Sequence, residues 1–302
     1  MGRKILNLNL FWYWMNERHS IYIKKCILKE KWPWTKDKIL QTYKFTNVFR
    51  QLDRVSLELA NRKTDLEKDQ LFFNIILFRM FNWPPTYDIL SESGLTYWWN
   101  EAKAIEVLTD YKLQGNKVFT GAYIITGGGL SNKGESKVQF VCRALTKFWK
   151  DRKKLEQTIN FHNSLELAVG FLTPYPCVGK FIAYEIVTDL RWTSILNNAG
   201  DIYTWANPGP GAKRGLNRIF GRPLAFRQSD AKFVTEMRLL LSMTNAQITD
   251  EIEMRSNKPK LKALFKESLE MRDIEHSLRE FDKYMRVKNG EGKPRSIYKN
   301  RG

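Results

Sequence analysis

A turn followed by a helix and an acidic residue is the first part of this sequence that could do chemistry. The stretch PYPCVGKFIAYEIVTDLRW, residues 174–192, has a turn rich in Pro and Gly and then an amphipathic helix starting at Lys180. Backbone amides at the start of such a helix can bind a phosphate, so Gly179 and Lys180 are expected phosphate ligands. Asp201 follows 22 positions after Gly179 and is the expected catalytic carboxylate. An ordinary packing corner with a solvated Asp would have the same spacing.

A glycine-rich run with four cations follows, NPGPGAKRGLNRIFGR, and three of these cations are candidates. Its glycines would let the backbone approach a ligand, and its cations lie at the start of a helix whose dipole also favours anions. We therefore expect a phosphate site made by Gly209, Gly211, Gly215, Lys213, Arg214 and Arg218, with a sharp surface loop as the alternative. The run GGGLSNKGES is not a Walker loop, because Gly rather than Ser or Thr follows Lys133. Kinase or GTPase activity is not expected of this chain.

Two arginines and an acid near the start of the chain form a third candidate. In PWTKDKILQTYKFTNVFRQLDRVS, Arg50 and Arg54 are four positions apart and would project from one helix toward one anion. Asp53 could hold one guanidinium in place, and it is the second candidate for the catalytic carboxylate. The alternative is a solvated charged face with one intrahelical ion pair.

Helical spacing of apolar residues predicts the elements that must position these side chains. Apolar residues recur at threes and fours in KDKILQTYKFTNVFRQLDRVSLELANR, with a helix start near Thr35. Further helices are expected at 10–29, 66–82, 86–95, 99–110, 137–149, 152–158, 163–169, 179–190, 213–219, 228–242 and 260–284. Only FTGAYIITGGG, residues 119–129, suggests a short extended piece. We expect an all-α, two-lobed domain over 1–285 and a basic, mobile tail over 286–302.

Charge and composition limit the partners. The 302 residues carry a net charge of +18, from 50 Lys and Arg against 32 Asp and Glu. Such a surface favours polyanions, nucleic acid first, although it could also serve solubility alone. The three cysteines have no paired spacing, and the apolar run LFFNIILFRMF is shorter than the roughly 20 residues that cross a bilayer. We expect a cytoplasmic protein without a membrane partner, and no His or Cys cluster predicts a metal.

Five segments in order along the chain carry a resemblance to a known family. They are PWTKDKIL, FTNVFRQLDRVS, LTPYPCVGKFIAYEIVTDLRW, NPGPGAKRGLNR and IEHSLREFDKY. Together they resemble the alpha-glutamyl/putrescinyl thymine pyrophosphorylases, also described as the helical domain associated with 5-hydroxymethyluracil DNA kinases. That family is linked to thymine hypermodification, chiefly in bacteriophages. Arg279 stands where a cysteine is common in it, so no role of that cysteine transfers to this chain.

A narrower likeness covers residues 165–215, which resemble the helix-hairpin-helix element of DNA glycosylases. The Leu-Pro-Gly-Val-Gly turn of that element grips a phosphate, and an aspartate follows about twenty residues later, near the place of Asp201. Cys177 stands at the first hairpin Gly, which puts phosphate gripping by this turn in doubt. The Schiff-base lysine of bifunctional glycosylases would fall at Phe181, so amine catalysis is not assigned to Lys180.

The family resemblance implies a substitution reaction on DNA. An amino acid or polyamine would replace the pyrophosphate on a 5-methylene-activated uracil, after the base has been flipped out of double-stranded DNA. Trp205 and, second, Trp192 could stack on that base, and Asp201 or Asp53 could take the proton of the amine. Arg50, Arg54, Lys213 and Arg214 could stabilise the leaving pyrophosphate, which Mg²⁺ could accompany. His162 and His276 could carry protons, but a lone His at a packing contact is the alternative.

Two other functions stay open. The chain could be a glycosylase that cuts the N-glycosidic bond with the help of Asp201. It could also be a DNA-binding helical module that positions a separate 5-hydroxymethyluracil DNA kinase.

Overall fold

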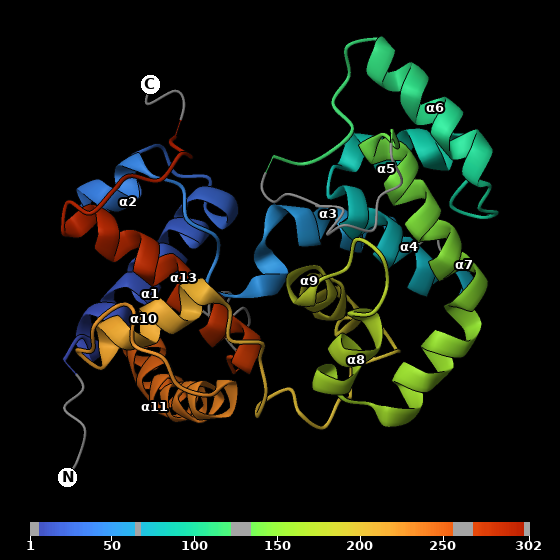
Figure 1. Cartoon of the computed structure of the whole chain (residues 1–302). Helices are drawn as coiled ribbons and strands as arrows, with labels where there is room; N and C mark the ends of the chain where they lie inside the picture. Colours follow the sequence, from blue (N-terminus) through green and yellow to red (C-terminus); the bar gives the residue numbers. More distant parts are fainter. Residues whose placement is uncertain (1–5, 64–67, 122–133, 256–267, 299–302) are drawn as a thin grey trace. The chain divides into compact units, whose positions relative to one another are not determined.

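The chain is built from helices joined by turns (Figure 1). The computed structural model describes residues 6–63, 68–121, 134–255 and 268–298. Across these ranges the β-type pairing is a single antiparallel bridge between Tyr43 and Ile297. The expected all-α class is therefore confirmed. Most of the extended piece expected at 119–129 lies outside the described residues.

The chain divides into two compact units. The first, unit 1, combines residues Met1–Asp53 with Ile202–Gly302, and the second, unit 2, is the continuous stretch Arg54–Asp201. The two crossings between units therefore fall at Asp53 and at Asp201, the two acids that the sequence singled out as candidate catalytic groups.

Helix α13 (Met271–Lys288) is the central element of unit 1. It contacts the other long helices of the unit, and residues along most of its length are buried. A capping box starts it: the Asp273 carboxylate accepts the backbone N–H of Glu270 at 2.9 Å. The remaining helices of unit 1 are α1 (Leu8–Tyr22), the π-helical turn η1 (Ile23–Ile27), α2 (Lys38–Thr42), the 3-10 turn η2 (Arg50–Leu52), α10 (Pro210–Ile219) and α11 (Asp230–Arg255).

Helix α10 packs very closely on α13, and its glycines explain how. A Cβ placed on Gly215 would lie 2.3 Å from the carbonyl oxygen of Leu278, and one on Gly211 would lie 2.7 Å from Cγ of Arg279. Both glycines are inside the helix, which begins three residues before the helix expected at 213–219, so the alternative of a sharp surface loop is wrong over Pro210–Ile219. The sequence pattern reflects close helix packing, because only a residue without a side chain fits against the α13 backbone.

The front of the chain also differs from the sequence prediction of one long helix. Helix α2 ends at Thr42, η2 covers Arg50–Leu52, and α3 begins at Arg54, so Arg50 and Arg54 do not share a helix. The start is as expected, since Asp37 caps α2 by accepting the N–H groups of Ile39 and Leu40. The helix stops because carboxylates elsewhere in unit 1 bind the N–H groups of residues 46, 47 and 50, which a helix would have used.

The C-terminal segment expected to be mobile from residue 286 makes contacts with the front of unit 1 over its described part, and its mobility stays a prediction. Helix α13 continues to Lys288, and Lys44 donates its backbone N–H to Ser296 at 2.9 Å. The Tyr298 ring lies 5.6 Å from that of Trp34, and the ammonium groups of Lys25 and Lys44 lie over it. Aromatic and cation-π contacts thus replace the apolar periodicity that this segment lacks.

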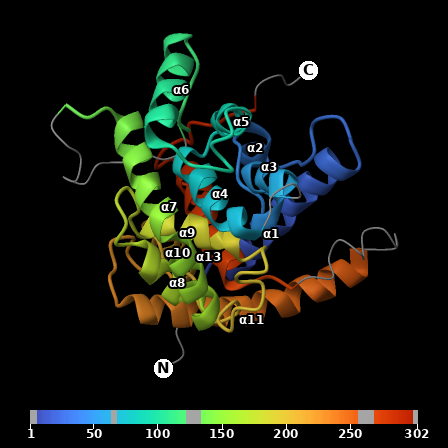
Figure 2. The same ribbon diagram turned by 90° about the vertical axis from the view of Figure 1, so that its right-hand side faces the viewer.

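Unit 2 surrounds the apolar helix α4 (Lys68–Phe81), which contacts α7 and α9 (Figure 2). Helix α7 runs unbroken over Lys137–His162, where the sequence predicted two helices, since no Gly or Pro interrupts residues 149–152. Ser136 and Gln139 form its capping box. The other helices of unit 2 are α3 (Arg54–Lys63), α5 (Pro84–Glu92), α6 (Glu101–Leu113), α8 (Leu165–Leu172) and α9 (Lys180–Leu190).

Candidate functional site

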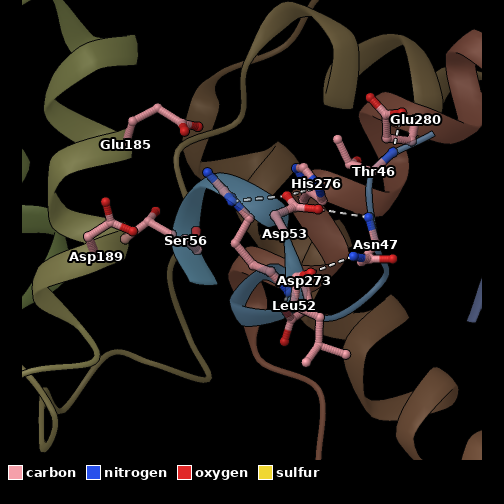
Figure 3. A network of polar contacts seen from close by, with 12 residues as sticks. Thr46, Asn47, Leu52, Asp53, Ser56, Glu185, Asp189, Asp273, His276 and Glu280 are labelled. Atoms are coloured by element: carbon pink, nitrogen blue, oxygen red, sulfur yellow. Dashed lines mark hydrogen bonds and ion pairs between the residues drawn. The ribbon is translucent and has the colours of Figure 1, made fainter. Parts of the chain in front are cut away.

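Asp53 is the centre of a buried polar network in unit 1 (Figure 3). One carboxylate oxygen lies 2.9 Å from Nη1 of Arg50 and 3.3 Å from Nε2 of His276. The other oxygen accepts the backbone N–H of Asn47 at 2.9 Å. Asp53 therefore joins its own turn to a histidine of α13, a residue more than two hundred positions later in the chain.

The contacts of His276 fix its tautomer. Its Nδ1 lies 2.6 Å from Nη2 of Arg279, and a guanidinium has donors only. Nδ1 must therefore present its lone pair to Arg279, which leaves the ring proton on Nε2, facing Asp53. A carboxylate that orients an imidazole in this way is a common support for proton transfer in enzymes.

The surroundings set the charge states of Asp53 and His276. Burial opposes ionisation of Asp53, but the contact with His276, the Arg50 guanidinium and the Asn47 amide outweigh it and hold the pKa of Asp53 far below its usual range. Burial, followed by the charge of Arg279, lowers the pKa of His276, although Asp53 opposes this shift. Because Nδ1 accepts from Arg279, we take His276 to be neutral, and Arg50 and the Asn47 amide then keep Asp53 ionised.

Two further acids of α13 hold the loop that carries Asp53. Asp273 accepts the backbone N–H of Arg50 at 2.8 Å, and burial raises its pKa to about 6. Glu280 accepts the backbone N–H of Thr46 at 3.1 Å and the ammonium of Lys283 at 2.6 Å. These bonds fix the loop on α13, so the network is rigidly positioned rather than carried by a loose surface segment.

The three cations of the expected phosphate site are engaged in ion pairs. Lys213 lies 2.6 Å from Asp230, and the guanidinium groups of Arg214 and Arg218 each lie 2.8 Å from the buried Asp282. Arg218 also binds Glu291. These residues join α10 to its neighbours in unit 1, and phosphate binding by them and by Gly209, the N-terminal cap of α10, stays a prediction.

Asp201 caps helix α8 in unit 2. Its carboxylate accepts hydrogen bonds from the Ser164 hydroxyl at 2.8 Å, from the Leu165 amide at 2.8 Å and from the Glu166 amide at 3.0 Å. Three donors on two oxygens satisfy amides that the first turn of a helix leaves unbonded. These three hydrogen bonds give Asp201 a structural role as a cap of α8, and its catalytic role stays a prediction.

The hairpin between α8 and α9 forms as the sequence predicts. Gly179 is the N-terminal cap of α9, the space beside it is open, and Lys180 is exposed. Cys177 has a φ of 67°, in the left-handed region that the glycine of the compared turn would favour. The backbone of this turn thus keeps a conformation suited to glycine although the side chain differs.

Other predicted residues do not belong to the contacts described above for the Asp53 network. Arg54 is exposed at the start of α3, and Trp192 has the Arg191 guanidinium 4.9 Å from its ring, both in unit 2. Trp205 is partly buried in unit 1. Of the residues considered in the sequence, the structure brings Arg50, Asp53 and His276 together, and it adds Arg279.

Sequence reasoning missed a second buried network, in unit 2. Arg79 donates two hydrogen bonds to Asp189, one of them very short, and its Nη1 lies 3.0 Å from Oδ1 of Asn82 and 3.5 Å from Glu185. Its Nη2 lies 3.2 Å from the Ser56 hydroxyl. The sequence did contain a signal for this network, the single arginine inside LFFNIILFRMF. A charged residue in such an apolar helix is buried and needs a buried partner of opposite charge.

The described ranges contain neither a metal-binding cluster nor a membrane-spanning helix. No group of three or more His, Cys, Asp or Glu side chains there is arranged to hold a metal ion. None of the described helices combines the length and apolarity needed to cross a membrane.

Comparisons with known proteins identify the family. The model of the family "5-hmdU DNA kinase, helical domain" matches residues 6–294. A 5-hmdU DNA kinase from Bacillus phage SP10 is 33% identical over 235 residues, which cover 69% of this chain and 36% of the phage protein. The chain thus matches little more than a third of that relative's length, and no solved structure matches the chain. With a family match across nearly all its described residues, the chain belongs to the 5-hmdU DNA kinase helical-domain family.

Proposed function

We propose that this protein modifies DNA at 5-hydroxymethyluracil, replacing the pyrophosphate of the pyrophosphorylated base with an amino acid or polyamine. The family match supports a substrate of this class. One observation supports the choice of chemistry: the His276 imidazole lies between the Asp53 carboxylate and the Arg279 guanidinium.

The reaction forms one bond and breaks another at a single carbon. The amine nitrogen attacks the methylene carbon attached to C5 of the uracil, and the C–O bond to the pyrophosphate breaks. Pyrophosphate leaves with the electron pair of that bond, and the nitrogen gives up one proton. The site must therefore provide a proton acceptor and positive charge for the leaving group.

The Asp53 network contains both kinds of group. We assign proton acceptance to Nδ1 of His276, which becomes available when Arg279 turns its guanidinium from the imidazole to the leaving phosphate. Asp53 is the positioning residue, because it holds the ring proton on Nε2 and its lowered pKa makes it a weak base. Arg50 supplies the second cation, and Mg²⁺ could accompany the pyrophosphate.

A product assay tests this proposal. DNA carrying 5-hydroxymethyluracil, or its pyrophosphorylated form, is incubated with amino acids and polyamines, with and without Mg²⁺, and digested to nucleosides for mass analysis. We expect an amine-bearing nucleoside from the pyrophosphorylated DNA alone, and much less of it with Asp53→Asn or His276→Gln. The exposed surface acid Asp88 provides the matched control Asp88→Asn, which should keep full activity. Unchanged DNA in every reaction would overturn the proposal.

The second candidate is a DNA-binding module for a kinase. It is favoured because this chain matches only 36% of the length of a phage protein that is named as a kinase, as one module of a larger protein would. If Asp53→Asn and Asp201→Asn both left modification intact in a mixture containing the kinase, while Arg50→Glu abolished DNA binding, the module would be preferred.

The third candidate is a DNA glycosylase. It is favoured by the hairpin between α8 and α9, where Cys177 keeps a left-handed backbone. Abasic sites in the same assay, lost in Asp201→Asn, would support it against the transferase.

A further inference from the structure

The turn between α5 and α6 holds two large aromatic side chains out in solvent. Tyr97 is 50% exposed and Trp98 is 72% exposed, although neighbours on both sides are buried. Thr96 is 1% exposed and accepts a hydrogen bond from Asn74, and Trp99 is 5% exposed and donates one to Thr146. The turn is therefore anchored on both sides, and the exposure of Trp98 is built into it rather than caused by a loose loop.

Trp98 belongs to a cluster of aromatic rings that reaches helix α7. Its ring lies 5.8 Å from that of Trp149, edge to face, and Trp149 in turn lies 4.9 Å from the buried Phe73. The guanidinium of Arg152 lies 3.6 Å above the Trp149 ring. An exposed indole thus stands beside a second indole that already carries a cation, on a base made rigid by the core.

The helix that carries Trp149 is strongly basic. Helix α7 has seven Lys and Arg residues against two acids, and the lysines around the cluster, Lys147, Lys150, Lys153 and Lys154, are exposed. Lys153 is one helical turn after Trp149, so its ammonium lies on the same side of the helix. The surface therefore combines stacking area with a row of positive charge.

We propose that Trp98, Trp149, Arg152 and Lys153 form a surface that binds an unpaired segment of DNA, with the Trp98 ring stacked on a base. Every base has a π face that such a ring can cover, and the cations match the phosphates of the strand. A protein partner would fit the aromatic rings, but the row of lysines favours a polyanion. The inference rests on the proposed function only in taking DNA as the ligand, and it adds a contact made by residues of unit 2 that do not belong to the Asp53 network.

Fluorescence anisotropy with a labelled single strand and a labelled hairpin duplex tests the surface. We expect Trp98→Ala to weaken single-strand binding by about 5- to 100-fold, and duplex binding by much less. Trp98→Phe should restore most of the affinity because it keeps a stacking ring. Lys153→Ala should lower the slope of log affinity against log salt by about 0.7. Phe161, 85% exposed at the far end of α7, provides the control Phe161→Ala, with no change expected.

The outcomes separate this surface from the proposed function. Affinity within twofold of wild type for Trp98→Ala, at an unchanged melting temperature, would overturn the stacking surface, whereas modification by the same variant would leave the transferase standing. Equal losses for strand and duplex would also overturn it, since they would indicate general charge attraction. If the wild-type chain bound no DNA at all, both proposals would fall together.

Discussion

Two buried arginine-aspartate pairs, one in each unit, differ in what surrounds them. Arg79 is 2% exposed, and its guanidinium binds both oxygens of Asp189, with further contacts to Asn82, Glu185 and Ser56. Nη1 of Arg50 lies 2.9 Å from one carboxylate oxygen of Asp53, and the imidazole of His276 lies 3.3 Å from the same oxygen.

The difference separates a structural ion pair from a candidate catalytic one. In unit 2, the described partners of Arg79 are acids, an amide and a hydroxyl, which hold the guanidinium in place. In unit 1, the network includes the imidazole of His276, which can accept and donate a proton and which links an aspartate to a second arginine. Buried charge alone therefore does not identify an active site, and the imidazole is what makes the unit 1 network the candidate.

The largest expected effect is on activity, in unit 1. His276→Gln keeps a donor toward Asp53 but removes the imidazole, so the single-turnover rate of amine transfer should fall by about 10²- to 10⁴-fold. Rates are measured at saturating DNA, together with the melting temperature and the DNA affinity. A loss of rate that only parallels a loss of folded protein would remove the catalytic interpretation.

The next effect is on stability, in unit 2. Arg79→Met takes the guanidinium away from two buried carboxylates and should lower the free energy of unfolding by about 3–5 kcal/mol. Arg62 binds Asp88 at the surface, so Arg62→Met should cost less than about 1 kcal/mol. Urea denaturation compares the two variants, and equal costs would contradict the distinction between buried and exposed pairs.

Close packing in unit 1 gives a third test. Gly215→Ala places a methyl group against the α13 backbone and should destabilise the protein by about 1–3 kcal/mol or more. Gly170 in α8 has open space beside it, so Gly170→Ala should stabilise by about 0.4–1 kcal/mol. If Gly215→Ala left the free energy of unfolding unchanged, α10 and α13 would be able to move apart without loss of stability.

Two substitutions of Asp201 distinguish a role in capping α8 from a role in catalysis. Asp201→Ala should cost about 1 kcal/mol, because the first amides of α8 lose their acceptor. Asp201→Asn keeps an oxygen for the cap and should leave the transfer rate within a fewfold of wild type. A large loss of transfer rate in Asp201→Asn, without loss of stability, would indicate that Asp201 is the catalytic base.

The smallest effect is a shift in titration. Burial and Arg279 lower the pKa of His276, so its imidazole should stay neutral as the pH falls below 6.5, the usual histidine value, and protonate only at lower pH. Arg279→Leu removes the smaller of these two causes and should move the titration to higher pH. The chain has three histidines, so NMR spectra of wild type and His276→Gln assign the resonance. If Arg279→Leu moved the His276 titration to lower pH, the contact between Arg279 and the imidazole would be contradicted.

Local patterns predicted the helices that local contacts make. Apolar periodicity and caps were enough for α2 to start after Asp37 and for the α8–α9 hairpin, since their bonds are close in sequence. The front helix was mispredicted because Asp273 and Glu280, far along the chain, compete for its amides. Gly211 and Gly215 looked like a ligand loop because close helix packing and close ligand approach require the same residue.

The site was predicted only in part for the same reason. Arg50 and Asp53 are three positions apart, so their pairing can be read from the sequence, whereas the pairing of Asp53 with His276 cannot. His276 looked like any lone histidine until α13 placed it against a carboxylate.

The chain order of the two units has a consequence for biosynthesis. Unit 2 is continuous and can fold as soon as the ribosome has released it, whereas Arg50 waits for Asp273, 223 residues later. The Asp53–His276 network should thus be among the last parts of a newly made molecule to assemble, and a nascent chain would have a finished unit 2 before this network forms.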